Sequence, residues 1–110
     1  MLAFNLTPSK CILLPKKISK IYQTFCVPFG EIKMVIYDNR QESPTKGVIN
    51  EIILNDTANY SLLSMPSNLW YSFKSTSKYF SLLANIIDEP HTPSESINLP
   101  LINTDIPYEW

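Results

Sequence analysis

The chain has 110 residues, of which 45% are apolar and 17% are charged, a composition typical of one globular domain over residues 1–110 rather than of a disordered segment. Nine basic and ten acidic side chains give a net charge of −1, which argues against a nucleic-acid-binding protein that neutralises phosphates. No stretch approaches the ~20 apolar residues of a membrane span, so we expect no association with a membrane.

Short β-branched and aromatic runs follow one another along the chain, separated by turn residues, and no long segment has a 3.6-residue apolar repeat. This pattern is typical of an all-β sandwich or barrel. The predicted strands, in chain order, are 10–14, 19–27, 31–38, 49–54, 60–65, 70–74 and 78–87. The barrel is therefore predicted to occupy residues 10–87.

The segments between and after these strands have distinct compositions. Residues 28–30, Pro-Phe-Gly, are suited to a tight turn because glycine adopts positive φ without steric cost. Residues 39–47 form a longer polar loop. Residues 88–110 are proline-rich but keep isoleucine, leucine, tyrosine and tryptophan, which a disordered tail would usually lack. We expect an extended C-terminal arm that wraps the barrel or a partner subunit.

Strand alternation indicates which side chains point the same way. In the strand 31–38 one face carries Ile32, Met34, Ile36 and Asp38, so an acid ends an otherwise apolar row. Tyr71 shares a face with Phe73 in a later strand, and Asn85 lies in the last one. An acid, a phenol and an amide could therefore meet at the mouth of a small barrel. The alternative is that Asp38 begins the loop with its carboxylate in water.

Histidine and cysteine are too scarce to suggest a metal site. His91 is the sole histidine and lies in the proline-rich stretch, whereas a histidine-based site needs two or three imidazoles. Cys11 and Cys26 both sit in apolar runs, where a buried free thiol is the usual state. We therefore expect no metal and a reducing, cytoplasmic location.

Four stretches together resemble a known family. They are GEIKMVIYDNR (30–40), SPTKG (43–47), MPSNLWYSFK (65–74) and IPYEW (106–110). In this order they resemble the dTDP-4-dehydrorhamnose 3,5-epimerase family of cupin-type barrels, especially its short members. That family has a strand ending in D-x-R, an S-P-T-x-G loop, an aromatic strand entered through proline, and an aromatic-rich tail. The resemblance covers roughly residues 20–110, and the D-x-R and S-P-T-x-G spacing is its most specific part.

The resemblance implies a cupin or jelly-roll barrel that is usually a homodimer and needs no cofactor. It also implies a nucleotide-linked 4-keto-6-deoxysugar as substrate, in the biosynthesis of surface-polysaccharide sugars. In that chemistry a base removes a proton next to the ketone, the enolate is stabilised, and an acid returns a proton to the other face.

The resemblance also implies a set of site residues. Asp38 and Arg40 match D-x-R, and Tyr71 falls where the family has a histidine. Lys74 and Asn85 match a lysine and an asparagine of the short members. The candidate catalytic residues are therefore Asp38 and Tyr71, and the candidate substrate-binding residues are Arg40, Lys74 and Asn85.

The usual proton-transfer residues are not matched. The family's base falls near Pro15 and its proton-donating tyrosine near Ala84, and neither side chain can transfer a proton. An unperturbed phenol titrates near ~10 and is a poor base at neutral pH. The alignment before residue 20 leaves room for Lys16, Lys17 or Tyr22 to reach the pocket.

The sequence leaves three interpretations open. The first is an epimerase or isomerase with a rearranged acid–base pair, in which burial raises the pKa of Asp38. The second is a catalytically degenerate cupin that binds a sugar nucleotide or another subunit. The third is a β-barrel that shares the fold alone.

Overall fold

The computed structural model describes residues 2–8, 12, 16–18, 22–58, 60–87 and 96–98, with the backbone alone at 2, 3 and 96–98. Every regular element in this part of the chain is a β-strand, as the all-β prediction requires. The strands are β1 (Leu2–Pro8), β2 (Lys16–Ile18), β3 (Gln23–Phe29), β4 (Glu31–Tyr37), β5 (Ile49–Asn55), β6 (Leu63–Met65), β7 (Trp70–Ser75), β8 (Phe80–Ile87) and β9 (Ser96–Asn98). Within these residues no helix is long and apolar enough to cross a membrane.

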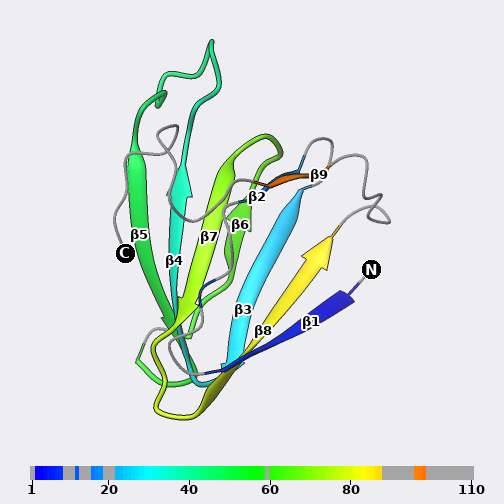
Figure 1. Ribbon diagram of the computed structural model, residues 1–110, viewed down its shortest axis with the longest axis vertical. Coiled ribbons are helices and arrows are strands. Elements are labelled where there is room, and N and C mark those ends of the chain that lie inside the picture. Colours follow the sequence, from blue (N-terminus) through cyan, green and yellow to red (C-terminus); the bar gives the residue numbers. More distant parts are fainter. Residues whose placement is uncertain are drawn as a thin grey trace.

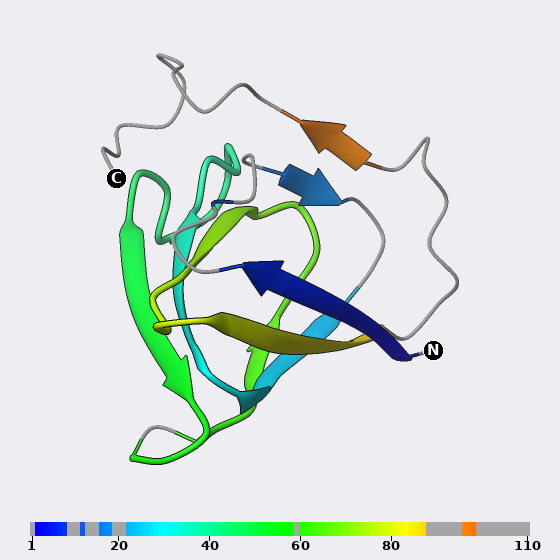
Figure 2. The same cartoon turned by 60° about the horizontal axis from the view of Figure 1, so that its bottom comes forward.

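The strands form two antiparallel sheets that face each other (Figure 1). The first sheet has the order β1-β8-β3-β6, and the second has the order β5-β4-β7-β2-β9. Figure 2 shows the short strands β2 and β9 side by side at one edge of the second sheet. Neighbours in each sheet are often distant in sequence, which is typical of jelly-roll topology rather than of a simple meander.

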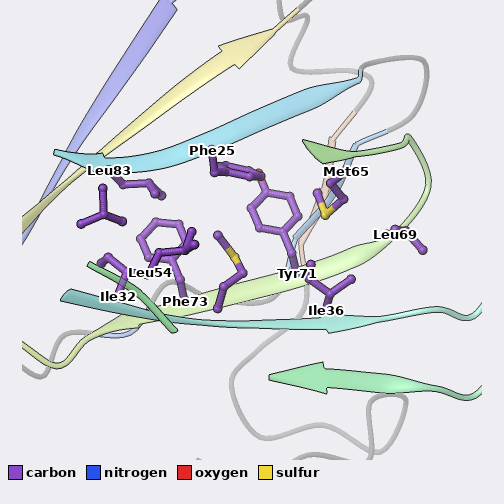
Figure 3. Packing of buried hydrophobic residues seen from close by; sticks show 11 residues of the cluster. Phe25, Ile32, Ile36, Leu54, Met65, Leu69, Tyr71, Phe73 and Leu83 are labelled. Carbon is purple, nitrogen blue, oxygen red and sulfur yellow. The ribbon is translucent and has the colours of Figure 1, made fainter. Parts of the chain in front are cut away.

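The core fills the space between the two sheets. Its members are Phe25, Val27, Ile32, Met34, Ile36, Leu54, Met65, Leu69, Tyr71, Phe73 and Leu83. They come mostly from alternate, inward positions of the long strands, as the period of two requires. In Figure 3 the rings of Phe25 (β3) and Tyr71 (β7) meet across the interior, with centroids 5.6 Å apart. The barrel is therefore packed with side chains at this level.

The long central strands lie where the sequence predicts them. β4, β5, β7 and β8 match the predicted ranges 31–38, 49–54, 70–74 and 78–87 within two residues at each end. The strand predicted over residues 60–65 is shorter in the structure, where β6 begins at Leu63. In the predicted strand 10–14 the structure describes Ile12, which forms an isolated bridge with Lys74.

Two features of the first sheet differ from the prediction. The first strand of the structure, β1, lies before residue 10, where the barrel is predicted to start. It pairs with β8 along its whole length. β3 begins at Gln23 rather than residue 19 and runs through Pro28 to Phe29. The tight turn predicted over residues 28–30 is present at Gly30, which joins β3 to β4 with a φ of 86°. The β3–β8 register shifts between Cys26 and Phe29, and proline is tolerated at such an irregularity because its missing N–H is not needed there.

The predicted C-terminal arm, residues 88–110, lies outside the described residues except for β9. The backbone of β9 pairs antiparallel with β2, with Ile97 opposite Lys17. The remainder of the arm, including His91, stays a prediction.

Candidate functional site

Asp38 takes the inward position that follows Ile36, just beyond the end of β4. The side chains of Ile32, Met34 and Ile36 point into the core. Asp38 continues this row and is only 5% exposed. The acid therefore ends the apolar row as predicted, and it also begins the loop, but its carboxylate is buried rather than in water. Its hydrogen bonds go to loop residues and not to Tyr71 or Asn85.

The carboxylate of Asp38 holds the loop of residues 38–48 in place. The backbone N–H and Nε of Arg40 donate to its Oδ1, and Arg40 Nη2 donates to its Oδ2, each at 3.0 Å. The hydroxyls of Ser43 and Thr45 also donate to Oδ2. The N–H of Gly47 closes the loop by donating to the Asp38 carbonyl at 2.7 Å. The residues of the D-x-R and S-P-T-x-G motifs therefore form one hydrogen-bonded unit.

These contacts set the protonation state of Asp38. The Arg40 guanidinium holds the pKa of this carboxyl far below its ordinary value. Burial alone would raise the pKa, but Arg40 together with Ser43 and Thr45 outweighs it. The expectation that burial raises the pKa of Asp38 is therefore wrong. An ionised carboxylate that accepts hydrogen bonds from several donors is a weak base and has no proton to give at neutral pH.

Tyr71 lies on the inner face of β7, directly opposite Ile36 of β4. It is 5% exposed, its ring packs against Phe25, and its hydroxyl donates to Gln23 Oε1 at 3.4 Å. Burial raises the pKa of Tyr71 to about 12, and the hydrogen bond to Gln23 only partly opposes this rise. The phenol therefore stays protonated at neutral pH and cannot serve as a general base.

Gln23 joins Tyr71 to Asn85, and it was not among the residues predicted from the sequence. Its Oε1 accepts from Tyr71 and also from Asn85 Nδ2, the latter at 2.9 Å. Asn85 Oδ1 is buried and has no partner among the described residues, which costs about 1–3 kcal/mol unless a donor reaches it. Strand alternation could have found this cluster, because Gln23 is the polar member of the inward row completed by Phe25 and Val27.

The structure thus brings two of the five candidate residues together around Gln23 and places the others elsewhere. Tyr71 and Asn85 share this inner cluster, whereas Arg40 and Asp38 form the loop unit. Lys74 lies opposite Lys33 in the register of β7 and β4. By alternation its side chain points to the outer face of the sheet, away from Tyr71. Among the described residues no group of three or more histidine, cysteine, aspartate or glutamate side chains could hold a metal ion.

The inner cluster is a buried, hydrogen-bonded group that has no proton-transfer pair: Gln23 is 1% exposed and Tyr71 is 5% exposed. Its members offer amide donors and acceptors and one protonated phenol. The nearest acid along the inner face of β4 is the ion-paired Asp38. Neither of the candidate catalytic residues therefore has a pKa near neutrality. Asn85 Oδ1 is the acceptor of this cluster that has no partner among the described residues.

Comparison with known proteins gives the fold and a family. No protein-family model matches the chain. The dTDP sugar isomerase from Desulfovibrio desulfuricans G20 is 35% identical, with a TM-score of 0.97 over 100% of this chain and 70% of that one. The dTDP-4-dehydrorhamnose 3,5-epimerase from Bacillus anthracis, solved with TDP and PPi bound, is 18% identical, with a TM-score of 0.88 over 100% and 64% of the two chains. At that lower identity the similarity shows the fold alone.

A curated protein is also similar over part of the chain. Agl13 of Haloferax volcanii, a probable low-salt glycan biosynthesis epimerase, is 34% identical over 61 residues. The match covers 56% of this chain and 38% of Agl13, so the matched segment is a little over a third of that relative. The similarity to the Desulfovibrio isomerase extends over the whole of this chain and shows that the protein belongs to the family of dTDP-sugar isomerases and epimerases with a two-sheet cupin fold.

Proposed function

We propose that this protein is a sugar-nucleotide-binding cupin that does not move protons on its ligand. The ligand class is a dTDP-linked deoxysugar, because the Desulfovibrio relative is named for a dTDP sugar and the Bacillus relative for dTDP-4-dehydrorhamnose. Agl13 is named as a probable epimerase of glycan biosynthesis, which favours a ligand among the activated sugars that supply surface polysaccharides. Epimerisation by a rearranged acid–base pair is the less favoured interpretation.

The observation that carries this proposal is the state of Tyr71. In the resemblance this position holds a histidine, whose pKa suits proton transfer near neutrality. Here the phenol is packed against Phe25, donates to Gln23 and has a pKa of about 12. Asp38 is equally unsuited, because Arg40 keeps it ionised and Ser43 and Thr45 both donate to its Oδ2. These contacts argue against proton transfer by either residue, and the proposal of binding rests on membership of the family.

Thermal unfolding in the presence of nucleotides tests the binding half of this proposal. A dTDP-sugar at one hundred times its Kd should stabilise the protein by about 2.7 kcal/mol and raise Tm accordingly. ADP at the same concentration serves as the control, because it carries the same diphosphate on a different nucleoside. If neither dTDP nor a dTDP-sugar raises Tm above the ADP control, the proposed ligand class is wrong.

We further propose that two copies of the chain associate through the outer face of the first sheet. Five large apolar side chains on this face are 41–65% exposed, namely Phe4, Leu6, Phe29, Phe80 and Ile86. The rings of Phe29 and Phe80 stack with centroids 4.8 Å apart, and the strands that carry the five side chains, β1, β8 and β3, are adjacent in the sheet. No described side chain on the outward positions of this sheet is charged. The five side chains expose on the order of 500 Å², more than half of the ~800 Å² that each partner contributes to a standard interface.

Light scattering during size-exclusion chromatography tests this association. The wild type should elute with twice the 12.6 kDa mass of the chain, and Leu6→Glu should elute as a monomer because it buries an unpaired charge in the contact. Ile53→Glu is the matched control, since Ile53 is 38% exposed on the outer side of the other sheet. A wild type that stays monomeric at tens of micromolar would contradict the proposal.

A further inference from the structure

The short strand β2 places two adjacent lysines on opposite faces of its sheet. Lys16 is directly opposite Tyr71 in the β2–β7 pair, and Lys17 is directly opposite Trp70. Residues paired in this way carry their side chains on the same face, with Cβ atoms roughly 5 Å apart. Lys16 therefore shares the inner face with Tyr71, whereas Lys17 shares the outer face with Trp70.

Contacts of the neighbouring residues agree with this assignment. Lys17 Nζ lies over the ring of Trp70, 5.1 Å from its centroid, in a cation–π contact. Ile18, which alternation places on the same face as Lys16, is buried against Ile87 of β8. Lys16 and Lys17 are both half-buried. The two lysines therefore differ in environment although they are neighbours in sequence.

The inner face offers Lys16 no counter-charge among the described residues. Its inward positions are otherwise filled by apolar side chains, by serine and threonine, and by the amides of Gln23 and Asn85. Asp38 is the carboxylate on this face, and its oxygens are occupied by Arg40, Ser43 and Thr45. An incoming anion would therefore find Lys16 without a competing carboxylate among the described residues, and pairing the two charges offsets the cost of desolvating them.

We infer that Lys16 is the residue that binds a phosphate oxygen of the ligand, at the end of the barrel where Tyr71, Gln23 and Asn85 lie. This inference rests on the proposed function and assigns the charged contact of the same site. Lys16 supplies N–H donors to an anionic oxygen, and charge-assisted hydrogen bonds of this kind are stronger than neutral ones. Lys17 has no such role, because it faces the other side of the sheet.

Calorimetric titration of dTDP into Lys16→Gln and Lys17→Gln variants of the full chain tests the inference. Lys16→Gln should weaken dTDP binding roughly tenfold or more, and Lys17→Gln should change it by less than about twofold. Lys16→Arg keeps the charge and should retain most of the affinity. Thymidine should bind weakly and equally to all variants, and inorganic phosphate alone shows whether the contact needs the nucleoside.

The outcomes separate this inference from the proposed function. If the wild type binds dTDP but Lys16→Gln binds equally well, or Lys17→Gln is weakened as much, the assignment of Lys16 is wrong and the proposed function stands. If the wild type binds no dTDP, both are wrong. The salt dependence of dTDP binding to the wild type is a further readout that needs no variant. The affinity for dTDP should fall as ionic strength rises. A Kd that does not change with salt would overturn the assignment.

Discussion

Replacing Gly30 with alanine is expected to destabilise the fold by about 3 kcal/mol or more. Gly30 has φ of 86°, and an added Cβ would lie 2.5 Å from Ser81 Oγ and 2.7 Å from the Phe80 carbonyl oxygen. Ser81 cannot move aside easily, because its buried hydroxyl donates to the Glu31 carbonyl, accepts from the Glu31 N–H and lies 2.8 Å from Ser75 Oγ. The β3–β4 turn thus requires glycine for both conformation and space.

Gly47 provides a matched control within the same chain. Its φ is 88°, almost the same as that of Gly30, but nothing lies within 4 Å of the position of an added Cβ. Gly47→Ala should therefore cost only the conformational strain, about 1 kcal/mol. Urea unfolding of both variants measures the difference. Equal losses for the two variants would show that the close approach of Gly30 to Ser81 does not govern stability at this turn.

Replacing Asp38 with asparagine is expected to lower the free energy of unfolding by about 2–4 kcal/mol at pH 7. The substitution removes the negative charge that Arg40 faces and puts an NH2 group where Arg40 or Ser43 and Thr45 now donate. Asp56→Asn is the control, because Asp56 is an exposed acid whose Oδ2 accepts from the N–H of Gly30 at 3.2 Å. That variant should lose less than about 1 kcal/mol.

The stability difference between wild type and Asp38→Asn should depend on pH in one direction. The pKa of Asp38 is lower in the folded state than the value of ~3.9 in an unfolded chain. Its contribution is therefore fully present above that unfolded value and is lost as pH falls toward the folded pKa. Urea unfolding at pH 7, 4 and 3 should show the two proteins converging in acid. A constant difference across this range would mean that the charge of Asp38 is not what stabilises the loop.

Much of the second sheet could be predicted from sequence because its strands have a clear period of two. β4 alternates Ile32, Met34 and Ile36 with polar or outward residues, and the structure buries this row. β1 was missed because its pattern is inverted. Its inward positions carry Asn5 and Thr7, whose side chains bond each other, and its apolar Phe4 and Leu6 point outward. Alternation finds such a strand only when the apolar face is the buried one.

The candidate site was predictable in position but not in chemistry. Alternation along β4 placed Asp38 on the inner face, but the direction of its pKa shift depends on Ser43 and Thr45, which reach it only when the loop closes. Alternation places Gln23 on the inner face, but its contact with Tyr71 does not follow from sequence, because the two residues are 48 positions apart and on opposite sheets. The pairing of Lys16 with Tyr71 is likewise a matter of register between distant strands.

The most direct test of the proposed function is solvent-deuterium incorporation into dTDP-4-keto-6-deoxyglucose, followed by NMR at the carbons next to the ketone. Folded protein that binds the nucleotide should give no exchange above the rate without protein, because neither Tyr71 nor Asp38 can accept a proton near neutral pH. Protein-dependent exchange at either carbon would contradict the central claim and would place this chain among the active members of its family.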